Sequence, residues 1–143
     1  MSKNAIIKRY NLLMTDVEAT YHEAAWRLGL SDSAMLILYT ICHNGEKCLL
    51  NDITSSSGIS KQTINSALRK LEAEDIIYLE STGGRKKMVC LTAKGKEYAQ
   101  NTVQKILEIE NDIFASWKET ERIAYLELTE KYLTTLKSKV KEL

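Results

Sequence analysis

The sequence contains no proline and only two histidines, and aromatic residues make up 7% of its 143 residues. Because proline interrupts helices and aromatic residues favour strands, this composition fits a largely helical chain with short connections. The three cysteines, Cys42, Cys48 and Cys90, are odd in number and lack metal-type spacing. A disulfide scaffold is therefore not expected.

The sequence also lacks the usual signs of an enzyme. A metal site needs three or four ligands, but no Cys-x-x-Cys or His-x-x-x-His pattern accompanies His22 and His43. The glycine pair at Gly83 and Gly84 has neither GxGxxG nor Walker spacing. We therefore expect no enzymatic activity, no cofactor and no metal, and a structural or solvated role for both histidines.

No window approaches the 18 or so apolar residues of a membrane span, and the N-terminus has no apolar run of signal-peptide length. A cytoplasmic protein without membrane contact is the expectation. The net charge of +1 indicates no particular partner. Its distribution does, because residues 59–96 carry eight basic and four acidic side chains, while the segments on either side are net negative. An anionic partner at residues 59–96 would require this distribution.

The segment from residue 51 to residue 92 predicts a helix, a tight turn, a second helix and a two-stranded hairpin. Gly58 is expected to adopt a positive φ in the turn. Ser60 has the chemistry of an N-cap, with Lys61 as the first residue of the second helix. At about 100° per residue, one face of this helix is apolar and the other polar. The apolar face holds Ile64, Ala67, Leu68 and Leu71, and the polar face holds Gln62, Ser66 and Arg69 with Asn65 and Lys70 on its flanks.

Two short β-favouring runs, residues 76–79 and 88–91, follow this helix. The turn between them contains the glycine pair, and Arg85, Lys86 and Lys87 follow it. A helix-turn-helix followed by a basic hairpin is a winged helix. Such a unit offers a helix to the major groove of DNA and a wing to the minor groove or its rim.

The run Gly-Arg-Lys-Lys-Met-Val-Cys-Leu-Thr-Ala-Lys-Gly, residues 84–95, resembles the MarR family of bacterial transcriptional regulators. Members commonly carry an Asp-Arg pair in the wing and a Leu-Thr-x-x-Gly motif before the next helix. Here Arg85, Leu91, Thr92 and Gly95 match this pattern. Gly84 stands in place of the usual aspartate, and Asp75 stands where the family tends to have glycine after the recognition helix. The resemblance implies a homodimer joined through the helices at both chain ends.

Periodic apolar residues predict further helices around this segment. One spans residues 3–28 and ends at Gly29, and another follows a cap at Ser31 or Asp32. Residues 48–50 are expected to form a minimal strand, and Asn51 to cap the first helix of the helix-turn-helix. A single long helix is expected from a cap at Thr92 to Phe114, followed by a last helix that begins in a capping box at residues 116–119.

The predicted fold is therefore mostly α with a small β-hairpin wing. Residues 31–92 form the winged helix-turn-helix, and residues 1–30 and 93–143 form the dimerisation helices. The expected partner is a near-palindromic double-stranded DNA operator. Gln62, Asn65, Ser66 and Arg69 are expected nearest the base edges; Lys61, Thr63 and Lys70 nearest phosphates; and Ser60, Arg85, Lys86 and Lys87 complete the predicted DNA-binding set.

Several alternatives stay open from the sequence. The polar helix face could serve a protein partner instead of DNA. Repression is the commoner mode in the family, but activation is also compatible. Cys48, beside Lys47, is the best candidate for a redox-sensing thiol, although a core role is favoured for the cysteines. A small-molecule effector pocket could be lined by aromatic residues that could equally belong to the core, namely Tyr10, Tyr21, Trp26, Tyr39 and Trp117.

Overall fold

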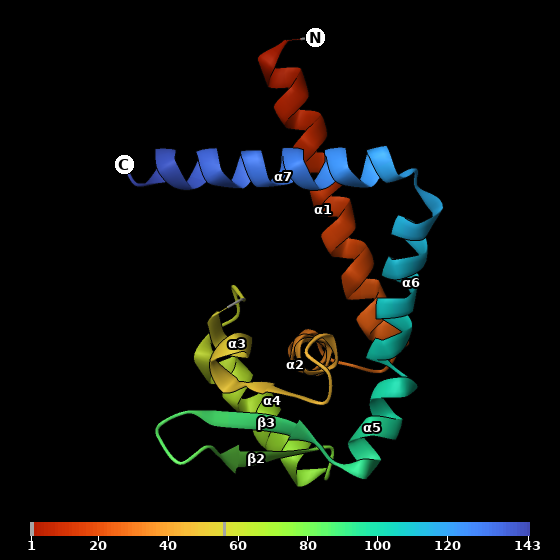
Figure 1. The fold of residues 1–143 in the computed structure, drawn as a ribbon, viewed down its shortest axis with the longest axis vertical. Coiled ribbons are helices and arrows are strands. Elements are labelled where there is room, and N and C mark those ends of the chain that lie inside the picture. Colours follow the sequence, from red (N-terminus) through yellow and green to blue (C-terminus); the bar gives the residue numbers. More distant parts are fainter. Residues whose placement is uncertain (1, 56) are drawn as a thin grey trace. The chain divides into compact units, whose positions relative to one another are not determined.

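A computed structural model describes residues 2–55 and 57–143. The described elements are α1 (Lys3–Arg27), α2 (Asp32–His43), β1 (Lys47–Leu49), α3 (Leu50–Ser55), α4 (Lys61–Ala73), β2 (Ile77–Ser81), β3 (Lys87–Leu91), α5 (Ala93–Gln100), α6 (Val103–Ser116) and α7 (Glu119–Val140) (Figure 1). The chain forms two compact units, residues 1–107 and residues 108–143, which are described separately. The expected fold class, mostly α with a β-hairpin wing, is confirmed.

The three strands form an antiparallel sheet in the order β1-β3-β2. The hairpin register pairs Ile77 with Leu91 and Ser81 with Lys87. The short strand β1 pairs with β3 on the other side, with Cys48 opposite Val89. The predicted strand at residues 48–50 therefore exists but lies one residue earlier, because Leu50 already begins α3.

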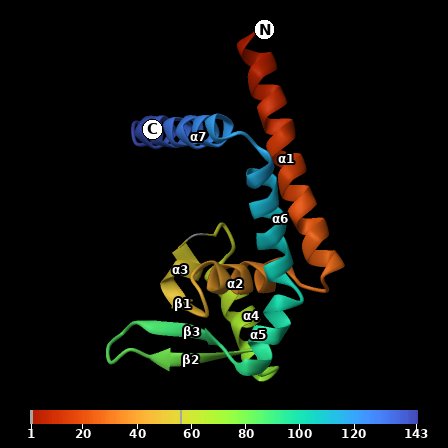
Figure 2. The ribbon, with the colours of Figure 1, turned by 45° about the vertical axis from the view of Figure 1, so that its right-hand side comes forward.

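The core of the winged helix lies among α2, α3, α4 and one face of the sheet (Figure 2). Helix α2 is capped by Ser31, whose hydroxyl accepts a hydrogen bond from Ala34 N at 3.1 Å. The apolar face predicted for α4 is buried as expected. The largest fully buried side chains are Ile37, Leu38, Ile41, Ile53, Ile64, Ile77, Val89 and Val103.

Helix α4 ends in a left-handed turn at Asp75, whose φ is +59°. Asp75 N donates to Glu72 O at 3.0 Å and Ile76 N donates to Leu71 O at 2.9 Å, the bond pattern of a Schellman motif. Glycine adopts this conformation most easily, so Asp75 holds a turn that favours glycine. Gly29 ends α1 in the same way, with φ of +73°. Gly58, by contrast, does not adopt a positive φ, so that expectation is wrong.

The Leu-Thr-x-x-Gly motif forms the junction between α4, β2 and α5. The Thr92 hydroxyl accepts a hydrogen bond from Gly95 N at 2.8 Å, which caps α5, and donates to Asp75 O at 2.6 Å. Gly95 is buried, and a Cβ atom there would collide with the carbonyl group of Ile76. The motif therefore packs the first turn of α5 directly against the backbone that follows the end of α4. We call this arrangement the Thr92 junction.

Three predicted helix boundaries are wrong. The long helix from Thr92 is broken into α5 and α6 around Thr102, a buried residue whose hydroxyl donates to Tyr98 O at 2.8 Å. Helix α7 begins two residues later than expected, because Glu121 Oε1 accepts from Lys118 N at 2.9 Å. The Ser116 hydroxyl instead donates to Ile113 O at 2.6 Å. Asn51 does not cap α3 but lies inside its first turn.

Residues 108–143 have their own small aromatic cluster. The rings of Trp117 and Tyr125 meet edge to face at a centroid distance of 5.4 Å, and Phe114 packs against both. Arg122 donates to the carbonyl oxygens of Phe114 and Trp117 at 2.9 and 2.7 Å. These contacts hold the turn between the end of α6 and α7.

Two helices expose broad apolar surfaces. In α1 only Ala25 is buried, and in α7 no described residue is buried. The larger exposed side chains are Ile6, Ile7, Tyr10, Leu12, Leu13, Met14, Val17, Tyr21 and Trp26 on α1, and Ile123, Tyr125, Leu126, Leu128, Tyr132, Leu133, Leu136 and Val140 on α7. Within the described ranges, no helix combines the length and the apolar character needed to cross a bilayer.

The cysteine side chains belong to the core rather than to a reactive site. Cys48 and Cys90 are each only 3% exposed. Burial, followed by the charges of Asp52 and Cys90, raises the pKa of Cys48 to about 11. Burial is also the main cause of the raised pKa of Cys90 and the cause of that of Cys42. Neighbouring side chains alternate between the two faces of a strand, so Lys47 lies across from Cys90 and does not activate Cys48. The structure therefore favours the core role over redox sensing.

We expect the substitution Gly95→Ala to lower the free energy of unfolding by roughly 1–3 kcal/mol, the range for overpacked sites. The added methyl group would force the first turn of α5 away from the Ile76 carbonyl. Urea denaturation followed by circular dichroism measures the change. Gly84→Ala is the matched control, because open space surrounds that position and its φ is not positive. Equal stability of the two variants would contradict the close approach at Gly95.

We expect the thiols of the folded protein to resist alkylation by iodoacetamide at pH 7.5. With a pKa of about 11, the Cys48 thiol is almost entirely protonated at that pH, and the thiolate is the reactive form. Mass spectrometry of timed samples, with the urea-unfolded protein as the reference, measures the rate at each cysteine. Modification of Cys48 as fast as in the unfolded chain would restore the redox alternative.

Candidate nucleic-acid interface

Helix α4 presents its polar residues to solvent, as the phase of the sequence predicts. Ser60 is the N-cap and its hydroxyl accepts from Thr63 N at 3.2 Å. The hydroxyl groups of Ser60 and Thr63 also lie 2.9 Å apart, so both side chains are engaged in the cap. The remaining predicted residues of this helix are exposed, namely Lys61, Gln62, Asn65, Ser66, Arg69 and Lys70.

Hydrogen bonds from Thr82 close the loop at the end of the wing. Thr82 donates to Lys86 O through its backbone amide at 3.4 Å and through its hydroxyl at 2.9 Å. Gly83, with φ of +85°, allows the chain to reverse between these two residues. Thr82 thus restrains the loop that carries Gly84 and Arg85. Arg85 and Lys86 on this loop and Lys87 at the start of β3 are all exposed.

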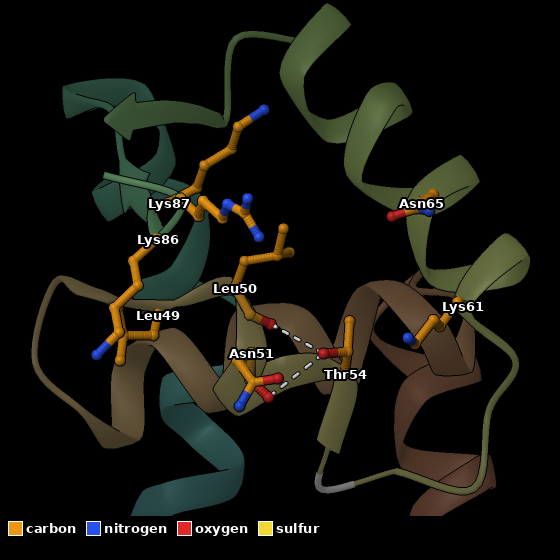
Figure 3. A pocket seen from close by; sticks show the side chains of 9 residues that line it. Leu49, Leu50, Asn51, Thr54, Lys61, Asn65, Lys86 and Lys87 are labelled. Carbon is orange, nitrogen blue, oxygen red and sulfur yellow. Dashed lines mark hydrogen bonds between the residues drawn. The ribbon is translucent and has the colours of Figure 1, made fainter. Parts of the chain in front are cut away.

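A groove of about 480 Å³ lies between α3, the start of α4 and the wing (Figure 3). It is lined by Leu49, Leu50, Asn51, Thr54, Lys61, Asn65, Arg85, Lys86 and Lys87. Figure 3 shows Lys61 and Asn65 on one side of the groove and Lys86 and Lys87 on the other. The start of α4 and the wing therefore bring four cationic side chains to one groove, and no carboxylate is among the lining residues.

The sequence prediction included Lys61, Asn65 and the three wing cations but missed the contribution of α3. Asn51 and Thr54 lie three residues apart on that short helix and both face the groove. The Thr54 hydroxyl is 3.3 Å from Asn51 O and 3.5 Å from Leu50 O, within its own helix. The i, i+3 spacing of two polar residues beside the buried Ile53 was the available signal in the sequence.

The cations of this surface are not neutralised by nearby acids. In residues 2–55 and 57–143 the ion pairs join His22 to Asp32, Arg27 to Glu23 and Lys96 to Glu46. None of these pairs involves a residue of α4 or of the wing. Unpaired cations on one face attract an anionic backbone more strongly than cations already bonded to carboxylates.

Other candidate sites find less support in the structure. His22 Nδ1 lies 2.8 Å from Asp32 Oδ2 at the surface, and His43 stacks on Tyr39 with ring centroids 5.9 Å apart. Among the described residues no group of three or more metal-ligating side chains exists. Trp26 is 76% exposed, and Trp117 packs within the second unit, so an aromatic effector pocket stays a prediction.

Comparisons with known proteins agree with this geometry. The sequence model described as "MarR family" matches residues 28–87. A comparison with curated protein sequences gives no match. The fold is similar to that of NMB1585, a MarR family regulator from Neisseria meningitidis, with a TM-score of 0.73 and 21% identity over 98% of this chain and 96% of that chain.

Two further solved structures share the fold. One is a complex of S. aureus MepR with DNA, with a TM-score of 0.64 and 18% identity over 95% of this chain and 98% of that chain. The other concerns regulation of DNA binding of Bordetella bronchiseptica BpsR by 6-hydroxynicotinic acid, with a TM-score of 0.56 and 19% identity over 92% and 93%. Residues 28–87, which hold most of the winged helix, thus match the MarR family, and the chain as a whole shares the fold of solved MarR family regulators.

Proposed function

We propose that this protein is a sequence-specific double-stranded DNA-binding transcriptional regulator. The observation that carries the proposal is the cationic groove between α4, α3 and the wing, whose lining residues include no carboxylate. Helix α4 enters the major groove, and the wing reaches the neighbouring minor groove or its rim. The DNA complex of MepR, a protein of the same fold, supports this mode of binding.

Different residues of α4 and the wing contact the bases and the phosphates. Gln62, Ser66 and Arg69 lie opposite its buried face and reach base edges. Lys70 and the wing cations contact phosphates. Ser60 and Thr63 form the helix cap, so they act chiefly by fixing where α4 begins.

A homodimer is the second part of the proposal. The exposed apolar faces of α1 and α7 are larger than a monomer in water tolerates, and a second copy of the chain would cover them. Residues 1–30 and 93–143 then act as dimerisation helices, and residues 31–92 bind DNA. A twofold dimer sets two α4 helices on a near-palindromic operator, with half-sites about one helical turn apart, roughly 34–36 Å.

Regulation by a small molecule is the third part. The DNA binding of BpsR, which has the same fold, is regulated by 6-hydroxynicotinic acid. In the present chain an effector would change the distance or angle between the two α4 helices of the dimer, and repression of transcription is the mode we propose. The protein acts in the cytoplasm, as a regulator and not as an enzyme.

We expect Arg69→Ala to lose discrimination between operator and random DNA and Lys87→Ala to weaken both alike. A base contact contributes roughly 1–3 kcal/mol of discrimination, whereas a phosphate contact contributes to every sequence. The operator is first obtained by selecting bound genomic fragments with the purified protein. Fluorescence anisotropy at fixed salt then gives both affinities, and an unchanged ratio for Arg69→Ala would show that the assigned face is wrong.

The same titrations test DNA binding against a protein-binding role. A complex dominated by phosphates loses affinity with salt at a log–log slope of about −0.9 per phosphate neutralised. For the Lys87→Ala variant we expect this slope to be shallower by about one. The absence of any selected fragment would favour a winged helix that binds a protein partner.

We expect the protein to sediment as a dimer at micromolar concentration and Leu128→Glu with Leu136→Glu to shift it to a folded monomer. Both leucines are exposed on α7, 64% and 46%. The introduced glutamates should therefore destabilise the dimer and not the fold of the single chain. Glu130→Lys, also exposed on α7, is the control. A wild-type monomer that binds the operator with full affinity would rule out the proposed dimer.

A further inference from the structure

We propose that the groove between α3, α4 and the wing holds the phosphodiester backbone of one DNA strand, with Asn51 and Asn65 as its neutral ligands. Asn65 then contributes affinity for any sequence rather than base discrimination, unlike Gln62 on the same helix. The inference rests on the proposed DNA-binding function and assigns the path of one strand across the surface.

The direction of Asn65 follows from the phase of α4. Ile64, Leu68 and Leu71 are buried and fix the inward direction of the helix. At about 100° per residue, Gln62 lies roughly 25° from the direction opposite to them, while Asn65 lies roughly 85° from that direction. Asn65 is on the side of Lys61, and Figure 3 shows both side chains directed across the groove toward α3 and the wing.

The chemistry of the groove suits a phosphate rather than a base edge. Lys61 and the wing supply four positive charges, and the side-chain amides of Asn51 and Asn65 supply neutral N–H donors. Phosphate oxygens only accept hydrogen bonds, and all six of these side chains can donate. Thr54 is excluded as a ligand, because its hydroxyl lies near the carbonyl oxygens of its own helix.

The position of the groove explains why a strand would run through it. One wall is the helix proposed to enter the major groove, and the other wall is the hairpin proposed to reach the minor groove. The backbone of one strand separates these two grooves of the duplex. A strand held against Asn51 in the groove would fix the distances of α4 and of the wing from the same strand. Such a contact positions the protein on the DNA and does not read the sequence.

The first test compares alanine variants at three exposed positions, Asn51, Asn65 and Gln62, on the selected operator and on random DNA. Asn51→Ala and Asn65→Ala should each weaken both DNAs by the same factor, about 2- to 10-fold for a lost hydrogen bond. Gln62→Ala should instead reduce the ratio between the two DNAs. Thermal melting confirms that each variant is folded. A reduced ratio for Asn65→Ala, or full affinity of Asn51→Ala, would overturn the assignment.

The second test locates the phosphate directly. Operator duplexes are made with one phosphate at a time replaced by a neutral methylphosphonate. Among the positions at which the wild-type protein loses affinity, one or two adjacent ones in each half-site should cost Lys61→Ala clearly less, because its contact there is already missing. Lys105→Ala, an exposed lysine outside the groove, should show the same losses as the wild type.

If every methylphosphonate weakens binding by the same factor for Lys61→Ala as for the wild type, Lys61 contacts none of those phosphates. This result would overturn the proposed strand path but leave DNA binding intact. If the wild-type protein binds no DNA, the proposed function fails as well. Retention on immobilised polyglutamate that disappears in Lys61→Ala would then assign the groove to an acidic protein segment and overturn both proposals.

Discussion

The Thr92 hydroxyl is the group on which the arrangement of the DNA-binding surface depends. It caps α5 through Gly95 N and bonds Asp75 O, the carbonyl group at which the chain leaves α4. The end of α4, the beginning of β2 and the beginning of α5 are thereby tied at one point. Because β2 and β3 form the wing, this junction fixes the root of the wing relative to α4.

Around that junction, the buried apolar side chains and the cationic side chains lie on different faces of the winged helix. The inner faces of α2, α3, α4 and the sheet form the core, and the cations of α4 and the wing stay in water without carboxylate partners among the described residues. Such a surface repels itself modestly in the free protein and gains most when an anionic backbone is bound. The sheet also encloses Cys48 and Cys90, which explains why thiols close to lysines in sequence are not activated.

The terminal helices differ from the winged helix in how much apolar surface they leave exposed to water. The winged helix buries most of its apolar residues, whereas α1 and α7 each expose many large apolar side chains. Under the proposed function, DNA reading belongs to the self-sufficient part and subunit contact to the helices that need a partner. An effector that alters the subunit contact would then act on DNA binding through the spacing of the two α4 helices.

The sequence by itself determined the local elements, because the spacing of apolar residues and the caps at Ser60 and Thr92 are short-range signals. It also identified the cations of α4 and the wing. The left-handed turn at Asp75 and the contribution of Asn51 involve contacts between distant segments, so periodicity could not show them. The apolar spacing continues through Thr102, so it does not reveal the break there. Periodicity also could not show that Lys61 and Asn65 face a groove. Only the tertiary structure decided this, since the wing and α3 define a direction that a single helix does not have.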